Sequence, residues 1–165
     1  MLELSILYLL KKQKLSLYAI KKNLDEKLPY LYSASMGSIY PLINKMEKEG
    51  LINQKTSYTK GGLKKKTVSI TKKGEEVFFN RMMEDFDCPM NHLELFVSAK
   101  ITFSGLIEEE YRKTMFTKII NKLEEKKQIL SLLLKKQKLN EFQGCHIEFL
   151  IRHTDSYVKW LEEKL

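Results

Sequence analysis

Apolar side chains recur every three to four positions through the first fifty residues of the chain, which is the spacing of an amphipathic helix. The pattern predicts three successive helices, over residues 2–10, 17–28 and 36–49. Ser16 stands where the second helix needs an N-cap, and Gly50 follows the third helix as a C-cap glycine. The N-terminal part of the chain therefore reads as a compact three-helix module.

The period of the pattern changes from about 3.6 to 2 after the third helix. Val68 and Ile70 alternate with hydroxyl-bearing residues, as in a half-buried strand. The pair Gly61–Gly62 supplies turn geometry before that strand, so we expect a β-hairpin. Thr71 then has the position and side chain of an N-cap for a fourth helix.

The rest of the chain has a helical pattern. Residues 87–91 contain Pro89 and separate it from the first part. Helices are expected over residues 92–103, 107–138 and 142–165. The middle one would be roughly 45 Å long, which is long for a core of this size. We therefore expect it to pack on a second copy of itself.

These patterns predict a fold that is mainly α with a small β-hairpin. Residues 1–87 would form an N-terminal winged helix-turn-helix DNA-binding domain, because three helices followed by a two-stranded wing is the order of that motif. Residues 88–165 would form a C-terminal helical dimerisation and regulatory domain. The expected assembly is a homodimer.

Charge supports a nucleic-acid partner for the first domain. The chain has 29 Lys and Arg against 21 Asp and Glu, a formal net charge of +8. The segment 53–74 has no acidic residue, and it contains seven lysines: Lys55, Lys60, Lys64, Lys65, Lys66, Lys72 and Lys73. A hairpin of one charge sign repels itself unless it rests on phosphates, where each lysine releases condensed counterions. The alternative is a solvated, lysine-rich loop.

The third helix offers candidate contacts to double-stranded DNA. Ser35 and Ser38 can bind phosphates at its N-terminus, and Ser35 can equally be a plain N-cap. Tyr40 fits either a DNA contact or a half-buried anchor. Asn44 could read a base, and Lys45 could bind phosphate or be ordinary solvated charge. With the wing, the predicted DNA-binding set is Ser35, Ser38, Tyr40, Asn44, Lys45, Lys60, Lys64, Lys65 and Lys66.

The last helix carries the candidate pairing surface. Its apolar and aromatic residues recur at helical spacing, and such a stripe is more often core or interface than a ligand box. The predicted dimerisation set is Phe142, Phe149, Leu150, Tyr157, Trp160 and Leu161. An effector pocket at a dimer interface is the alternative.

Other classes of function find little support in the sequence. His146 and His153 are two turns apart and do not make a helical metal pair, so no metal site is expected. The sequence lacks a catalytic triad, a phosphate loop and a cofactor fingerprint, so we expect neither an enzyme nor a cofactor. It also lacks a membrane-spanning run and a secretory signal, which predicts a cytoplasmic protein that does not bind membranes.

Residues 35–52, Ser-Met-Gly-Ser-Ile-Tyr-Pro-Leu-Ile-Asn-Lys-Met-Glu-Lys-Glu-Gly-Leu-Ile, resemble the third-helix signature of the PadR family. Residues 61–66 and the following strand resemble that family's wing, although Leu63 stands where an arginine is usual. The resemblance covers roughly the first half of the chain. The helical second half is similar to the longer form of the family.

This resemblance implies a transcriptional regulator that binds a palindromic operator as a homodimer. A repressor released by a small-molecule effector is the favoured version. One alternative is an activator of virulence genes that needs no effector. The other is a protein-interaction adaptor built on a winged helix, although adaptors of that kind often lose the basic wing.

Overall fold

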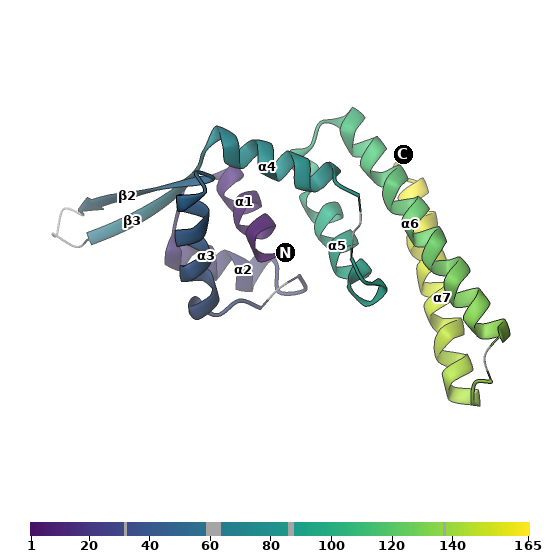
Figure 1. The fold of residues 1–165 in the computed structure, drawn as a ribbon. Coiled ribbons are helices and arrows are strands. Elements are labelled where there is room, and N and C mark those ends of the chain that lie inside the picture. The colour runs from purple at the N-terminus through teal and green to yellow at the C-terminus, as the bar shows by residue number, and fades with distance from the viewer. Residues whose placement is uncertain (32, 59–63, 86–87, 137) are drawn as a thin grey trace. The chain divides into compact units, whose positions relative to one another are not determined.

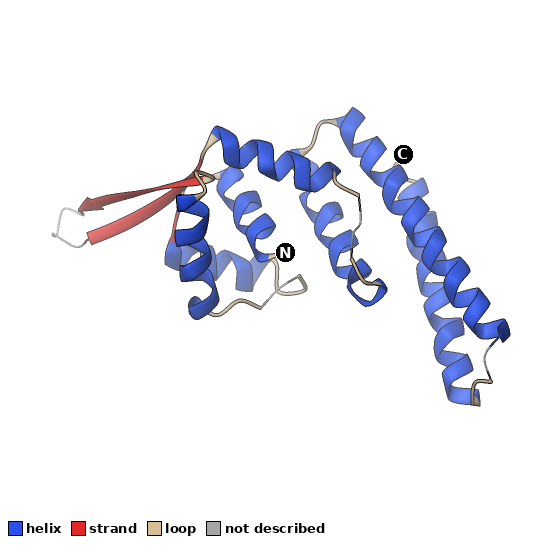
Figure 2. Cartoon of the chain, in the orientation of Figure 1, coloured by secondary structure: helices blue, strands red, loops and turns tan. Residues whose placement is uncertain are grey.

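The computed structural model describes residues 1–31, 33–58, 64–85, 88–136 and 138–165. Helices make up most of this part of the chain, and the strands within it form one small sheet (Figure 2). The predicted fold class, mainly α with a small β-hairpin, is confirmed.

The chain divides into two compact units. Unit 1 consists of Met1–Glu84 and Glu94–Ile107, and unit 2 consists of Asp85–Leu93 and Glu108–Leu165. The first helix after the predicted boundary at residue 87 thus belongs almost wholly to unit 1. The division into two functional domains at that residue stays a prediction.

Unit 1 begins with the three expected helices, α1 (Leu2–Lys12), α2 (Leu17–Lys27) and α3 (Met36–Lys48) (Figure 1). The side chain of Ser16 caps α2 by accepting a hydrogen bond from the backbone N–H of Ala19 at 3.2 Å. One apolar stripe of each helix points into a common core. Its fully buried members are Ile6, Leu7, Ile20, Leu24, Ile39, Ile43 and Met46.

The sheet of unit 1 has three antiparallel strands in the order β1-β3-β2. Strands β2 (Ile52–Tyr58) and β3 (Lys64–Ile70) form the predicted hairpin, in which Gln54 lies opposite Val68. Strand β1 (Leu15–Ser16), which the sequence pattern did not predict, pairs with β3 through Leu15 and Val68. Because β3 is central, β2 lies at the edge of the sheet.

A tight junction joins α3, the hairpin and α4 (Lys72–Met83). Gly50 has a φ of 75°, and the next N–H, that of Leu51, donates to the carbonyl of Met46 at 2.9 Å. This left-handed helix end favours glycine. Gly74 lies so close to the hairpin that a Cβ there would be 2.1 Å from the carbonyl oxygen of Leu51. Thr71 caps α4 by accepting from the N–H of Gly74 at 3.0 Å.

Helix α5 (Leu93–Phe103) packs on the first helices of unit 1. The ring of Phe103 stacks on Tyr8 of α1, with 4.2 Å between the ring centroids. The hydroxyls of Tyr30 and Thr102 lie 3.3 Å apart. Short 3₁₀ helices precede and follow α5, over Met90–His92 and Ser104–Leu106.

Unit 2 is dominated by α6 (Glu109–Lys136) and α7 (Glu141–Glu162), which pack side by side (Figure 1). Asn140 and Gln143 form a capping box at the start of α7. The buried side chains of this unit include Ile119, Leu123, Leu130, Val158 and Leu161. The long helix that the sequence predicted therefore has a packing partner in its own chain.

Candidate nucleic-acid interface

The N-terminal turn of α3 is exposed and polar. The hydroxyl of Ser35 accepts from the N–H of Ser38 at 3.3 Å, and the hydroxyl of Ser38 donates to the carbonyl of Ser35 at 2.8 Å. Ser35 is therefore the N-cap, as expected. The first N–H groups of a helix lack helical partners and carry the positive end of its dipole, so this turn can receive a phosphate.

The two faces of α3 differ sharply. Ile39, Ile43 and Met46 are fully buried, whereas Tyr40 is 47% exposed. Lys45 is also exposed and pairs with Glu49, with 3.7 Å between nitrogen and oxygen. The helix thus buries one stripe in unit 1 and presents its opposite side to solvent.

Asn44 has a different environment from the other predicted residues of α3. It is half-buried, and its amide oxygen lies 3.5 Å from the side-chain nitrogen of Gln54 on β2. The same nitrogen donates to the carboxylate of Glu47 at 2.7 Å. Asn44 therefore lies at the contact between α3 and the hairpin.

The hairpin places the lysines of the wing beyond this contact. Lys64, Lys65 and Lys66 occupy β3 positions opposite Tyr58, Ser57 and Thr56, at the end of the hairpin far from α4. Lys66 is half-buried, and the more inward Lys55 of β2 is exposed. Lys60, the remaining predicted contact of the wing, lies outside the described residues.

Sequence reasoning passed over an exposed tyrosine. Tyr18, the second residue of α2, is 75% exposed, although it is aromatic. The one available signal was its place outside the apolar stripe of α2, in which Ile20 and Leu24 are fully buried. An exposed aromatic residue in the first turn of a helix-turn-helix is a further candidate for contact with the DNA backbone.

The predicted pairing residues lie on α7 with very different exposures. Phe142 is 82% exposed, Phe149 60% and Trp160 43%. Leu150 and Tyr157 are half-buried, and Leu161 is fully buried inside unit 2. Leu161 thus has a place in the core of unit 2, and the exposed residues are the ones available to a second copy.

Aromatic and imidazole rings form a row along α7. The ring centroids of His146 and Phe149 are 6.4 Å apart, those of Phe149 and His153 are 6.0 Å apart, and those of His153 and Tyr157 are 5.9 Å apart. Within the described part of the chain, no group of three or more His, Cys, Asp or Glu is placed to hold a metal ion.

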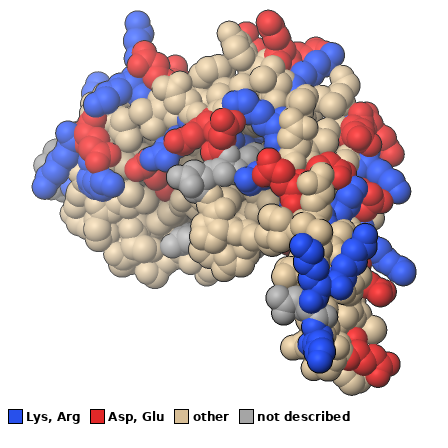
Figure 3. Space-filling view, turned by 45° about the vertical axis from the view of Figure 1, so that its right-hand side comes forward, with Lys and Arg blue, Asp and Glu red and all other residues tan. Residues whose placement is uncertain are grey.

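The charges of unit 2 are mixed in sign. Lys127 of α6 contacts Glu124 at 2.6 Å and reaches Asp155 of α7 at 3.2 Å. Hydrogen bonds from Lys159 and Lys127 hold the pKa of Asp155 below its ordinary value. Figure 3 shows basic and acidic side chains on one face of the described part of the chain. In unit 2, Lys127 and Lys159 are paired with carboxylates and so offer little free positive charge to a polyanion.

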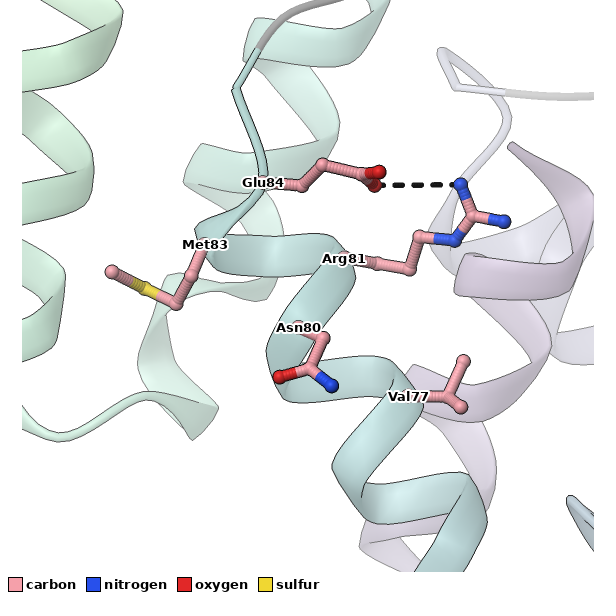
Figure 4. Close-up of a pocket in the computed structure, with 5 residues that line it drawn as sticks. All are labelled: Val77, Asn80, Arg81, Met83 and Glu84. Atoms are coloured by element: carbon pink, nitrogen blue, oxygen red, sulfur yellow. Dashed lines mark hydrogen bonds and ion pairs between the residues drawn. The ribbon is translucent and has the colours of Figure 1, made fainter.

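A hollow of about 540 Å³ lies beside the C-terminal half of α4 (Figure 4). It is lined by Val77, Asn80, Arg81, Met83 and Glu84. Arg81 and Glu84 extend to one side and form an ion pair at 3.4 Å, while Met83 points the other way. Because its two charges face each other, the hollow offers little to fix a charged ligand. Over the described residues, no helix is both long and apolar enough to cross a membrane.

Helices α2 and α3 form a helix-turn-helix in which one face of α3 is exposed, and a basic hairpin follows them. This arrangement defines unit 1 as a winged-helix module of the kind that binds DNA. The comparisons with known proteins agree. Residues 6–80 match the model of the "Transcriptional regulator PadR-like family". The N-terminal part of this chain is therefore similar to the PadR-like family of transcriptional regulators.

One relative is similar to a longer stretch of the chain. The "Negative transcriptional regulator PadR" of Bacillus subtilis is 29% identical over 109 residues, which are 66% of this chain and 60% of that protein. The chain thus aligns with about 60% of the length of this relative.

The solved structures similar to this chain include two of Bacillus subtilis PadR. The structure of Bacillus subtilis PadR in complex with operator DNA has a TM-score of 0.51 and 23% identity, covering 98% of this chain and 94% of that one. It shows that the fold is shared over nearly the whole chain. A structure of the same protein in complex with p-coumaric acid has a TM-score of 0.47 and 24% identity, covering 98% and 95%.

Proposed function

We propose that this chain is a sequence-specific transcriptional regulator that binds a two-fold symmetric operator as a homodimer in the cytoplasm. The observation that carries the proposal is the pairing of an exposed, polar α3 N-terminus with a hairpin that has no acidic residue between 53 and 74. The first can enter the major groove, and the second can follow the adjacent backbone.

DNA readout would be divided between the two elements. Ser35, Ser38 and Lys45 would position α3 on phosphates, with Tyr40 beside them. Lys60, Lys64, Lys65 and Lys66 would supply the sequence-independent attraction of the wing. Asn44 is half-buried and lies 3.5 Å from the side chain of Gln54, so its role at the DNA would depend on this neighbour in β2.

Pairing would depend on α7. A single winged helix reads only a short site, and two copies on a two-fold axis read half-sites roughly 34–36 Å apart. Phe142, Phe149 and Trp160 expose apolar surface that a second copy would cover. Ile129 and Leu132 of α6, in the same unit, are also exposed apolar residues.

The direction of regulation is proposed as repression. The relative from Bacillus subtilis is by name a negative regulator, which supports this sense. Release by a small-molecule effector completes the proposal, as the family resemblance implies. An activator that needs no effector is distinguished by its effect on a reporter gene placed behind the operator.

Selection of duplexes from a random-sequence pool by the purified protein tests the proposed function. We expect an enriched motif with two inverted half-sites whose centres lie about 10 base pairs apart or at a multiple of that spacing. No enrichment would contradict the proposal and favour the protein-interaction adaptor. Enrichment of one unrepeated half-site would contradict the two-fold arrangement alone.

A further inference from the structure

Glu47 links α3, the helix proposed to enter the major groove, to β2, the edge strand of the wing. It does so through two hydrogen bonds to Gln54. One carboxylate oxygen accepts from the backbone N–H of Gln54 at 3.1 Å, and the other accepts from the side-chain nitrogen of Gln54 at 2.7 Å. Because β2 is the edge strand, alternate N–H groups of it face away from β3. Glu47 occupies one of these outward N–H groups.

The contact with Glu47 leaves the other side of the Gln54 amide without a hydrogen bond. The amide oxygen of Gln54 is buried without a hydrogen-bond partner, the one such side-chain atom among the described residues. Turning the amide over would place that oxygen 2.7 Å from the Glu47 carboxylate, where two acceptors would repel each other. The nitrogen of the amide is therefore the atom that suits the side facing Glu47.

The contact lies near the base of the hairpin, whereas the wing lysines lie near its far end. Gln54 is the third residue of β2, and the lysines at positions 64–66 of β3 lie opposite residues 56–58, farther along the hairpin. From Gln54 to Tyr58 an extended strand covers roughly 14 Å. A small change of angle at Gln54 thus moves the basic end of the hairpin by a larger amount.

We infer that Glu47 and Gln54 form a clamp that sets the direction of the wing relative to α3, and that they are positioning residues for DNA binding. The inference rests on the proposed function. It adds how α3 and the wing, the two proposed DNA-binding elements, are held relative to each other. Glu47 would act through the wing lysines, since a carboxylate is repelled by phosphate. Asn44 borders the clamp through its 3.5 Å approach to Gln54.

The test uses the full-length protein and a duplex that the wild type has selected from a random pool. Glu47→Ala removes both hydrogen bonds. Glu49→Ala is the control for charge, because it removes the same charge beside α3 but not the clamp. It also releases Lys45 from its 3.7 Å ion pair, so the exchanged pair below carries the decisive comparison. The double variant Glu47→Gln with Gln54→Glu restores the side-chain bond with donor and acceptor exchanged, at unchanged net charge.

We expect Glu47→Ala to bind the duplex roughly tenfold more weakly than Glu49→Ala. Its salt slope should also be smaller, by about one unit for each wing lysine that no longer reaches a phosphate. The exchanged pair should recover most of both quantities. Gln54→Ala, which keeps the backbone bond, should weaken binding less in the same direction and serves if Glu47→Ala does not fold.

Three results would overturn the clamp. Glu47→Ala could match Glu49→Ala in affinity and slope. It could bind more weakly with an unchanged slope, which would indicate a role in folding alone. The exchanged pair could remain as weak as Glu47→Ala. A wild-type protein that selects no duplex would instead overturn the proposed function together with the clamp.

Discussion

The two units use charge in opposite ways. The hairpin of unit 1 and its flanks, residues 53–74, contain lysine and no acidic residue, so their positive charge is not balanced within that segment. In unit 2 several lysines of α6 and α7 are paired with carboxylates, as in the series Glu124, Lys127, Asp155 and Lys159. The hairpin of unit 1 leaves its positive charge available to a polyanion, whereas these charges of unit 2 are paired within the unit.

The two units also differ in how much apolar surface they expose: unit 1 buries most of its apolar side chains, and unit 2 exposes several of its own. The apolar side chains of α1, α2 and α3 are largely inside unit 1, whereas α7 leaves Phe142, Phe149 and Trp160 exposed. A surface that is apolar and mixed in charge suits a second copy of the chain, and a surface that is basic suits DNA. The proposed function assigns DNA binding to unit 1 and pairing to unit 2, and the following substitutions test the differences between the two units.

Substitution of Gly74 in α4 and of Gly144 in α7 should give the largest contrast between the units. A Cβ at Gly74 of α4 would lie 2.1 Å from the backbone oxygen of Leu51, so Gly74→Ala must shift the hairpin. We expect a loss of unfolding free energy of about 3 kcal/mol. A Cβ at Gly144 of α7 meets nothing within 4 Å, so Gly144→Ala should gain up to about 1 kcal/mol.

Chemical denaturation of both variants measures this contrast. Gly144→Ala is the control for the general effect of replacing a helical glycine with alanine. A Gly74→Ala protein as stable as the wild type would show that the junction between α3, the hairpin and α4 can relax. The tight packing described for unit 1 would then be wrong.

Charges placed on the exposed face of α7 should separate the two copies. Phe149→Glu together with Trp160→Glu would bring like charges together across a two-fold interface, and we expect a monomer at micromolar concentration. Light scattering measures the mass, and operator affinity should fall because one copy reads one half-site. The control is Glu148→Gln, which changes an exposed neighbour of Phe149 without adding charge. A double variant that stays dimeric would place the pairing surface elsewhere.

The ion pairs of unit 2 should have the smallest effect. The pKa of Asp155 is lowered because Lys159 and Lys127 donate hydrogen bonds to its carboxylate. Its contribution to stability is therefore present above the unfolded value of 3.8 and is lost as the pH falls through the lowered folded value. The group is exposed, so the contribution is small.

Thermal melting of Asp155→Asn and the wild type at a series of pH values tests this sign. The wild type should melt slightly higher at neutral pH, and the difference should shrink as the pH falls below 3.8. A difference that grows on acidification would contradict the assigned cause.

Strong local signals made the secondary structure of unit 1 predictable. Ser16, Gly50 and Thr71 stand at helix ends in the structure as they do in the sequence pattern. Strand β1 was missed because two residues, Leu15 and Ser16, are too few to show an alternating pattern.

Relations between distant residues were harder to predict. The pattern of α6 gave its length but could not say whether its partner was α7 or a second copy. The contact of Asn44 with Gln54 spans ten positions and two kinds of element, so no periodicity indicates it. The same holds for Leu161, whose place inside unit 2 is indistinguishable in sequence from that of the exposed Trp160.

The salt dependence of DNA binding tests the separation of roles most directly. The triple variant Lys64→Ala, Lys65→Ala and Lys66→Ala is compared with Lys113→Ala, Lys122→Ala and Lys135→Ala in α6, which removes the same net charge. With a selected duplex, the wing variant should bind all sequences more weakly, and its salt slope should fall by up to about three units. The α6 variant should keep the wild-type affinity and slope. Equal losses in the two variants, or an unchanged slope in the wing variant, would contradict the assignment of DNA binding to unit 1.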